Sequence, residues 1–344
     1  MKAMAITAYG QPLEPLDVAE PEAGPGQALV EVLACSVCFS DVKTARGKMP
    51  YSSSLTLPHV PGHEICARVV TCDPPDPFAP GALVIVYHVW PCRRCGRCRA
   101  GMDNQCTSPV AWTGFTHPGG FQQRLVVPVD RLIAVPDGID PVHAAPMTCA
   151  LGTAYRAVVS RGRVAPGSTV VVLGLGGVGI HALQVAAAAG SRALGIDVSP
   201  AAIAAARGLG LDALGPDDDA DAAVMDATGG DGADVVVDVV GHPDTCLRAQ
   251  RLVRAGGRVV AVGYGLDSDF AFPSTRFVLE EVELVGSRYA LPFEMERAVQ
   301  LVASGAVRTV VDSVRPLDQA NDALDDLEGG RVVGRTVLDV GGVS

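Results

Sequence analysis

The sequence is poor in aromatic residues and has little concentrated positive charge. Aromatic side chains make up 5% of the 344 residues, and 38 acidic residues outnumber 27 basic ones, which gives a formal charge of −11. The one short basic run, RRCGRCR, covers residues 93–99. A nucleic-acid backbone would therefore find no matching positive surface, and we expect no nucleic-acid partner.

Long apolar segments are also lacking. No stretch reaches the roughly 18 uninterrupted apolar residues of a membrane span. The first residues, MKAMAITAYGQPLEP, lack the charged-then-apolar order of a signal peptide. We therefore expect no membrane partner and a cytoplasmic location. Hydrophobic residues still make up 48% of the chain, enough for a large core, and the length predicts two domains.

The cysteines are unevenly distributed, since nine of the ten fall between Cys35 and Cys149. In a reducing cytosol this clustering favours metal binding over disulfides. The loop PCRRCGRCRAGMDNQC contains four of them, with two, two and then seven residues between: Cys92, Cys95, Cys98 and Cys106. Four thiolates can surround one zinc ion and leave no open position, so a structural role is predicted. An iron–sulfur cluster and a set of unconnected thiols are the alternatives.

The pattern of secondary structure changes along the chain. The first 150 residues contain short β-type runs such as ALVEVLAC and lack long helical periodicity. From residue 167, strands such as STVVVLG alternate with Ala-rich helical stretches such as GIHALQVAAAAG. This alternation predicts a doubly wound parallel sheet and an α/β class. The acidic run PDDDADAA is expected to form a loop.

A glycine-rich turn follows the first strand of the α/β part. The segment TVVVLGLGGVG places Gly174, Gly176, Gly177 and Gly179 between a strand and a helix. Glycines let the backbone approach a pyrophosphate, whose charge the helix N-terminus stabilises. Asp197 ends the next strand, where a carboxylate can bind ribose hydroxyls and would repel a 2′-phosphate. NAD is therefore favoured over NADP, and a tight turn without a ligand is the alternative.

With these features in order, the chain resembles the medium-chain, zinc-dependent alcohol dehydrogenase family along nearly its whole length. Three shorter elements, CFSD, PGHE and APMTC, also match. The resemblance implies a GroES-like, β-rich catalytic domain formed by 1–150 and 288–344, and an NAD-binding Rossmann domain at 151–287. It also implies a homodimer or homotetramer, commonly joined through the edge of the cofactor sheet, where VELVGSRY lies.

The resemblance assigns a catalytic zinc to Cys38, His63 and Cys149, which would make two zinc ions per chain. Two thiolates and an imidazole leave a fourth zinc position for an alcohol or carbonyl oxygen, while a nicotinamide cofactor exchanges hydride with the substrate carbon. Outside the family pattern, His63 would be interpreted as a structural histidine and Cys149 as a small buried hydrophobe.

Further roles are implied by the same resemblance. Ser40 matches a hydroxyl that passes the substrate proton toward the cofactor ribose. Asp41 matches the carboxylate that orients the His63 imidazole. Glu64 matches a residue that lies behind the zinc ligands or binds the zinc transiently. Asp41 and Glu64 as ordinary buried hydrogen-bonding residues are the alternative. Arg335 matches the residue that holds the pyrophosphate. The expected cofactor contacts are Gly174, Gly176, Gly177, Val178, Gly179, Asp197, Val262 and Arg335.

Two positions depart from the family pattern. Phe39 stands where many members have a His or Arg that binds pyrophosphate, and Lys43 stands where many have a relay histidine. A lysine is normally protonated at neutral pH, so we expect no essential proton transfer through Lys43.

An apolar pocket is predicted from residues on both sides of the four-cysteine loop, namely His88, Trp90 and Trp112. It would suit a medium-sized aliphatic or aromatic alcohol, primary or secondary, although packing within the domain is the alternative. The leading hypothesis is thus an NAD-linked zinc alcohol dehydrogenase or carbonyl reductase. A reductase of activated C=C bonds on the same scaffold and a non-catalytic nucleotide-binding redox sensor remain as alternatives.

Overall fold

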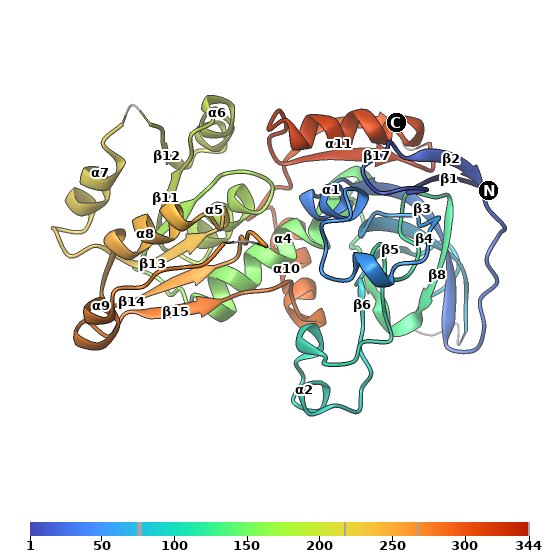
Figure 1. Cartoon of the computed structure of the whole chain (residues 1–344), viewed down its shortest axis with the longest axis horizontal. Coiled ribbons are helices and arrows are strands. Elements are labelled where there is room, and N and C mark those ends of the chain that lie inside the picture. Colours follow the sequence, from blue (N-terminus) through green and yellow to red (C-terminus); the bar gives the residue numbers. More distant parts are fainter. Residues whose placement is uncertain (74–77, 217, 267, 343–344) are drawn as a thin grey trace. The chain divides into compact units, whose positions relative to one another are not determined.

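The computed structural model describes residues 1–73, 78–216, 218–266 and 268–342. The chain divides into unit 1, comprising 1–149, 291–303 and 309–344, and unit 2, comprising 150–290 and 304–308 (Figure 1). The predicted domain boundaries differ from these by one residue at 149 and by three at 291. The short segment 304–308, which was predicted in the catalytic domain, lies in unit 2.

Unit 1 is rich in β-structure. Its strands are β1 (Lys2–Ala5), β2 (Glu14–Asp17), β3 (Gln27–Ser36), β4 (Glu64–Cys72), β5 (Leu83–Val86), β6 (Val89–Trp90), β7 (Ala111–Trp112), β8 (Arg124–Pro128), β9 (Leu132–Ala134), β16 (Val311–Pro316) and β17 (Arg335–Asp339). Its larger sheet has the order β16-β17-β3-β4-β5-β9, with β8 also paired to β3. Strands from both ends of the chain therefore share one sheet, since Leu338 of β17 pairs with Cys35 of β3.

The core of unit 1 lies against this sheet. Val30 and Val32 of β3, Ile65 of β4 and Val84 of β5 are completely buried in one apolar cluster. The helices of unit 1 are α1 (Phe39–Ala45), α2 (Gly96–Arg99), α3 (Pro141–Ala144), α10 (Pro292–Ala303) and α11 (Ala320–Glu328). Helix α1 begins three residues after β3 ends, and α11 packs against it. Because so few residues separate them, the position of the buried strand β3 limits where α1 can begin.

Unit 2 contains a parallel sheet. Its strands are β10 (Thr169–Leu173), β11 (Arg192–Ile196), β12 (Asp212–Leu214), β13 (Ala233–Asp238), β14 (Val253–Ala261) and β15 (Glu283–Gly286). The order is β12-β11-β10-β13-β14-β15, and each of the five adjacent pairs is parallel. The predicted α/β fold class is confirmed, and the strand order reverses direction between β10 and β13. Such a switch point is where doubly wound sheets bind ligands.

Helices connect the strands of unit 2. They are α4 (Ala150–Tyr155), α5 (Gly179–Ala188), α6 (Pro200–Gly208), α7 (Ala220–Ala227), α8 (Pro243–Leu252) and α9 (Ser274–Leu279). Helix α5 is rich in small apolar side chains, and its eight residues from Gly179 to Ala186 are all buried. The connection from β10 to α5 is the glycine-rich turn, so the turn lies at the carboxyl edge of the sheet (Figure 1).

The acidic run PDDDADAA was wrongly predicted to be a loop throughout. Residue 217 lies outside the described residues, but α7 begins at Ala220, within the run. The carboxylate of Asp219 accepts a hydrogen bond from Ala222 N at 3.1 Å and caps the helix. An aspartate at this position stabilises a helix start because it pairs with an otherwise unsatisfied backbone donor.

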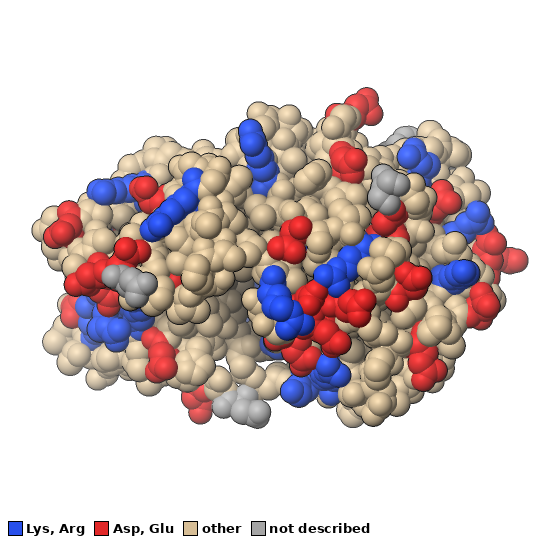
Figure 2. All heavy atoms as spheres, turned by 90° about the horizontal axis from the view of Figure 1, so that it is seen from above, with Lys and Arg blue, Asp and Glu red and all other residues tan. Residues whose placement is uncertain are grey.

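The surface carries interspersed charge. On the face shown in Figure 2, Lys and Arg side chains alternate with Asp and Glu side chains. Among the described helices, none is long and apolar enough to cross a membrane.

Candidate metal and cofactor sites

Four buried side chains from three separate segments meet in unit 1. The sulfur atoms of Cys38 and Cys149 and one ligand atom each of His63 and Glu64 lie within 4.8 Å of one another. Sheet pairing explains the meeting of the first two segments: Ser36 at the end of β3 pairs with Glu64 at the start of β4. Cys38 and His63 therefore leave the same edge of the sheet.

Asp41 connects two of these segments. Its Oδ2 accepts a hydrogen bond from the backbone N–H of Cys38 at 2.8 Å, and its Oδ1 lies 3.0 Å from Nδ1 of His63. The side chains of Asp41 and His63 are both fully buried. A carboxylate is an acceptor, so Nδ1 carries the proton and Nε2 keeps its lone pair.

The cluster fits a metal ion. Nε2 of His63 is buried and has no hydrogen-bond partner among the described residues, which is costly for a ring nitrogen without a ligand. Two thiols, an imidazole with the correct tautomer and one carboxylate form a typical donor set for zinc. The three residues predicted to bind the catalytic zinc are thus brought together, with Glu64 beside them.

Arg335 is the fifth member of the cluster. Its Nε and Nη2 lie 3.0 and 2.9 Å from the Glu64 carboxylate, and Nη2 lies 3.6 Å from Sγ of Cys38. A pyrophosphate contact was predicted for this guanidinium, whereas its contacts among the described residues include Glu64 and Cys38. The contact between Arg335 and Glu64 was not predicted, since the two residues lie 271 positions apart and no local sequence pattern joins them.

The electrostatics of the cluster favour a thiolate. A hydrogen bond with Cys149 and the charge of Arg335 hold the pKa of Cys38 well below its usual value, although burial opposes this. Burial raises the pKa of the Glu64 carboxyl to about 7, against the opposing charge of Arg335. A thiolate at Cys38 is the form that binds a metal.

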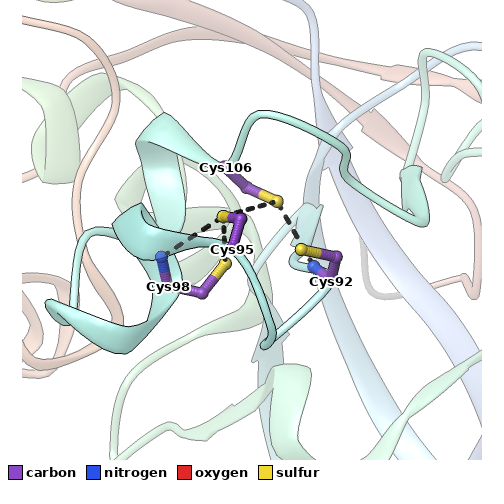
Figure 3. A group of neighbouring side chains, drawn as sticks. All are labelled: Cys92, Cys95, Cys98 and Cys106. Carbon is purple, nitrogen blue, oxygen red and sulfur yellow. Dashed lines mark hydrogen bonds between the residues drawn. The ribbon is translucent and has the colours of Figure 1, made fainter.

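The four-cysteine loop forms a second cluster. All four sulfur atoms lie within 4.8 Å of one another, and Figure 3 shows the side chains of Cys92, Cys95, Cys98 and Cys106 converging. The sulfur of Cys95 lies 3.4 Å from that of Cys98 and 4.0 Å from that of Cys106. Tetrahedral zinc–thiolate geometry implies about 3.8 Å between sulfurs, whereas a disulfide would need about 2 Å. The arrangement fits a closed metal site.

Backbone donors also point at these sulfurs. The N–H of Cys92 donates to Sγ of Cys106, and the N–H of Cys98 donates to Sγ of Cys95. The hydrogen bond from the Cys98 backbone lowers the pKa of Cys95 to about 5. The buried guanidinium of Arg131 links the loop to strand β6, because it contacts both Asp103 in the loop and Val89 O of β6.

The glycine turn of unit 2 needs glycine for two reasons. Gly174 has φ +89°, and a Cβ at Gly179 would lie 1.8 Å from Gly174 O, so the strand end and the helix start are in contact. Gly176 is exposed, and a Cβ there would meet nothing within 4 Å. The backbone at Gly176 is therefore open to a ligand, as pyrophosphate binding requires.

The remaining predicted cofactor residues lie at the same edge. Asp197 follows β11, and its carboxylate accepts hydrogen bonds from Leu175 N in the glycine turn and from Ser199 N before α6. Val262 follows β14, and its N–H donates to Asp238 O. Asp197 thus joins two segments of the expected site, a connection that the motif spacing did not reveal.

Aromatic side chains surround His63 in unit 1. The ring centroid of Phe115 lies 4.5 Å from that of His63, and the ring of His88 lies 5.5 Å from it. Tyr51 stands edge-on to Phe115 at 5.8 Å and to Trp112 at 6.1 Å. His88 and Trp112 therefore belong to one aromatic cluster beside the metal ligands. Tyr51 was not predicted from the sequence, because it lies more than 50 residues before the two rings that it contacts.

Trp90 differs from the other two predicted pocket residues. It is 8% exposed and packs in the apolar core of unit 1. Its Nε1 donates to Oγ1 of Thr113 at 2.9 Å, and its ring lies 4.3 Å from that of His117. This position corresponds to the packing alternative stated above, because the indole is enclosed by other side chains.

The two departures from the family pattern lie together on α1. Phe39 is 47% exposed, and Nζ of Lys43 lies 5.7 Å from the centroid of its ring. Burial lowers the pKa of Lys43, against the charge of Cys38. Ser40 lies between them in the first turn of α1 and is partly exposed.

The parallel sheet with a glycine turn, joined to a β-rich unit with two cysteine-containing clusters, defines a two-domain metal-binding dehydrogenase. Residues 24–137 match the model of the alcohol dehydrogenase GroES-like domain, and residues 177–304 match that of zinc-binding dehydrogenases.

Similar proteins span the whole chain. An alcohol dehydrogenase from Geobacillus stearothermophilus is 32% identical over 342 residues, which cover 98% of each protein. An NAD-dependent alcohol dehydrogenase from Sulfurisphaera tokodaii is 31% identical, covering 98% of this chain and 99% of that one. A crystal structure of an NAD-dependent alcohol dehydrogenase superposes with a TM-score of 0.91 at 30% identity, covering 99% and 100%. The chain belongs to the zinc-dependent, medium-chain alcohol dehydrogenase family and is an oxidoreductase.

Proposed function

We propose that this enzyme interconverts an alcohol and its aldehyde or ketone with NAD as the hydride carrier and two zinc ions per chain. The observation that carries the proposal is the buried Nε2 of His63, which has no hydrogen-bond partner among the described residues and lies with two cysteine sulfurs. A bound zinc ion would supply a Lewis acid for the substrate oxygen, and the cofactor would accept a hydride as NAD+ or donate one as NADH. Named relatives that are NAD-dependent alcohol dehydrogenases support the same activity.

Cys38, His63 and Cys149 would hold the catalytic zinc. Asp41 would keep the His63 ring in the required tautomer, because it accepts from Nδ1. Arg335 binds Glu64 through two nitrogens and so restrains the carboxylate of Glu64 beside the ligands. We assign Ser40 the task of passing the substrate hydroxyl proton on during oxidation: its oxygen would take that proton while its own proton moves on toward the cofactor ribose, and the reverse would hold during reduction. Its hydroxyl is on the turn that begins at Cys38.

The cofactor residues would act through the backbone and one carboxylate. Gly176 gives the pyrophosphate close access, and the first N–H groups of α5 point toward the same edge of the sheet. The Asp197 carboxylate would accept hydrogen bonds from the adenosine ribose and repel a 2′-phosphate. These features support NAD over NADP. The free thiols of the described cysteines suit the reducing cytoplasm that we propose as the location.

The substrate class follows from the aromatic cluster of Tyr51, His88, Trp112 and Phe115. The rings of Tyr51 and Trp112 are partly exposed, and both pack against the buried ring of Phe115. These two rings would offer a substrate apolar area with few hydrogen-bonding groups, which suits a medium-sized aliphatic or aromatic alcohol. Phe115 is completely buried and contacts the ring of His63, so the cluster begins directly at a proposed zinc ligand.

Self-association through unit 2 is part of the proposal. Strand β15 is the last strand in the order of the described parallel sheet, and the preceding helix α9 exposes Phe277, Val278 and Leu279 by 54, 67 and 79%. An edge strand beside exposed apolar side chains is a surface that proteins usually cover. A second copy of the chain would cover it in a homodimer or homotetramer. Leu279→Asp should lower the mass measured by light scattering.

One experiment tests the activity. NADH oxidation is measured with a panel of aldehydes, ketones and enals on protein whose zinc content has been determined. The expected result is two zinc ions per chain and turnover of apolar aldehydes or ketones. Exclusive turnover of enals would instead support the C=C reductase. Tight NAD binding without any turnover would support the redox sensor.

A further inference from the structure

We propose that His181 is a positioning residue that orients the Gly177–Val178 peptide for the cofactor pyrophosphate. His181 lies in the first turn of α5 and is completely buried. Its Nδ1 lies 2.6 Å from the carbonyl oxygen of Gly177, and a carbonyl only accepts, so the ring donates. This inference rests on the NAD-linked function proposed above.

The ring of His181 adds a side-chain donor to the start of a regular helix. Ile180 N donates to Gly176 O at 3.0 Å, and Ala182 N donates to Val178 O at 2.9 Å, as a helix requires. The Gly177 carbonyl lies between these two acceptors and accepts from the His181 ring. The imidazole thus attaches the glycine turn to the body of α5.

Fixing this carbonyl also fixes the next N–H group. A trans peptide is planar, and its C=O and N–H point in opposite directions. Because Gly177 O points into the helix toward His181, the N–H of Val178 points out of the helix N-terminus. That is the direction from which an anion approaches a helix start.

The turn needs such a restraint because of its composition. Gly176 and Gly177 have no side chains, and glycine has more backbone freedom than any other residue. Gly176 is exposed, and a Cβ there would meet nothing within 4 Å, so packing at that position does not hold the peptide. The buried imidazole of His181, two residues inside the helix, supplies a fixed hydrogen-bond donor. Its hydrogen bond to Gly177 O reduces the backbone conformational freedom of the glycine turn.

His181 acts on the ligand only through the backbone. Its ring is fully buried, so it cannot contact a nucleotide at the exposed edge of the sheet. Its replacement should therefore change the affinity for the pyrophosphate and leave the affinity for the adenosine part unchanged. This separation distinguishes a positioning role from general destabilisation.

The experiment compares His181→Leu, which removes the donor and keeps a similar volume, with His181→Asn, whose Nδ2 can donate from the same side-chain position. Calorimetry measures the affinities of the zinc-loaded full chain for NAD, ADP and adenosine. Hydrogen exchange measures protection of residues 174–182 without nucleotide. For His181→Leu we expect about a five- to tenfold weaker affinity for NAD and ADP, the effect of one hydrogen bond, and faster exchange. Adenosine affinity should not change.

His181→Asn should stay within about twofold of the native affinity if one hydrogen bond is what matters. Native affinity for ADP in His181→Leu, or an equal loss of affinity for ADP and adenosine, would overturn the inference. Unchanged hydrogen exchange in His181→Leu would overturn it as well. If the unmodified protein binds none of the nucleotides, the proposed NAD function fails, whereas the exchange comparison still reports on the role of His181 in the turn.

Discussion

Asp41 accepts a hydrogen bond from His63 at 3.0 Å, between two fully buried side chains, and thereby sets which ring nitrogen can bind a metal. The other oxygen of Asp41 accepts from the backbone of Cys38. One carboxylate therefore orients two of the three proposed ligands of the catalytic zinc. Removing it should loosen both.

Asp41→Asn should weaken catalytic zinc binding by about 10- to 100-fold, the usual effect of losing a residue that orients a ligand. Asparagine keeps the size but can present an N–H to His63, which would favour the wrong tautomer. Zinc retention is measured against increasing concentrations of a chelator, with Asp226→Asn at an exposed position as the control. Identical retention in both variants would show that Asp41 does not orient the site.

Cys35 is completely buried and Cys38 almost completely, but the two cysteines have different neighbours. Cys38 lies in the group of potential metal ligands, whereas Cys35 pairs in β3 with Ile65 of β4 and lies outside that group. Cys38→Ser should remove one zinc ion per chain and abolish turnover. Cys35→Ser should keep two zinc ions and most activity. Zinc analysis by mass spectrometry decides, and loss of zinc from Cys35→Ser would contradict the assignment.

The four-cysteine loop should contribute to stability and not directly to the reaction. Cys95→Ser should release one zinc ion, keep the catalytic one and lower the thermal midpoint by several degrees, because a closed metal site contributes folding free energy. Cys72→Ser, at a half-buried cysteine outside both clusters, is the matched control. Calorimetric scans of both variants test this, and a Cys95→Ser protein with an unchanged midpoint would argue against a structural site.

Features formed by residues close together in the sequence could be predicted, whereas contacts between residues far apart in the sequence could not. The four-cysteine loop and the glycine turn are local, so spacing and composition were enough to predict them, and the family and the α/β fold class are confirmed. The contact of Arg335 with Glu64 spans 271 positions, and that of Tyr51 with Trp112 also joins distant segments. The first contact depends on how β3, β4 and β17 pair, which side-chain patterns alone do not specify.

Ser40 and Lys43 should differ strongly in importance. Ser40→Ala should reduce kcat by about 100-fold or more, as expected for loss of a group that transfers the substrate proton. Lys43→Ala should keep most activity, because the ammonium group lies over the Phe39 ring and not in the proposed proton path. Steady-state rates with saturating NAD provide the comparison. A loss in Lys43→Ala as large as that in Ser40→Ala would place Lys43 in the proton path.

Acid should destabilise the protein partly through His59. This ring is 5% exposed, its Nε2 lies 3.3 Å from Gly114 O, and burial, helped by the charge of His117, lowers its pKa to about 4. The unfolded chain has a histidine pKa of about 6.5 and therefore binds more protons between the two values. The contribution of neutral His59 is complete above pH 6.5 and is lost as the pH falls toward 4. The total loss is at most about 3.4 kcal/mol.

His59→Gln tests this because glutamine fills a similar space and does not titrate. The free energy of unfolding in urea is measured for both proteins at pH 7, 6, 5.5 and 5. Over this range the histidine of the unfolded chain, with a pKa of about 6.5, goes from mostly neutral to mostly protonated. The native protein should lose stability relative to His59→Gln by up to about 1.4 kcal/mol per pH unit below pH 6.5. Acid effects on the zinc ligands are common to both proteins and cancel in the difference. Parallel curves over this range would show that His59 is not held neutral in the folded state.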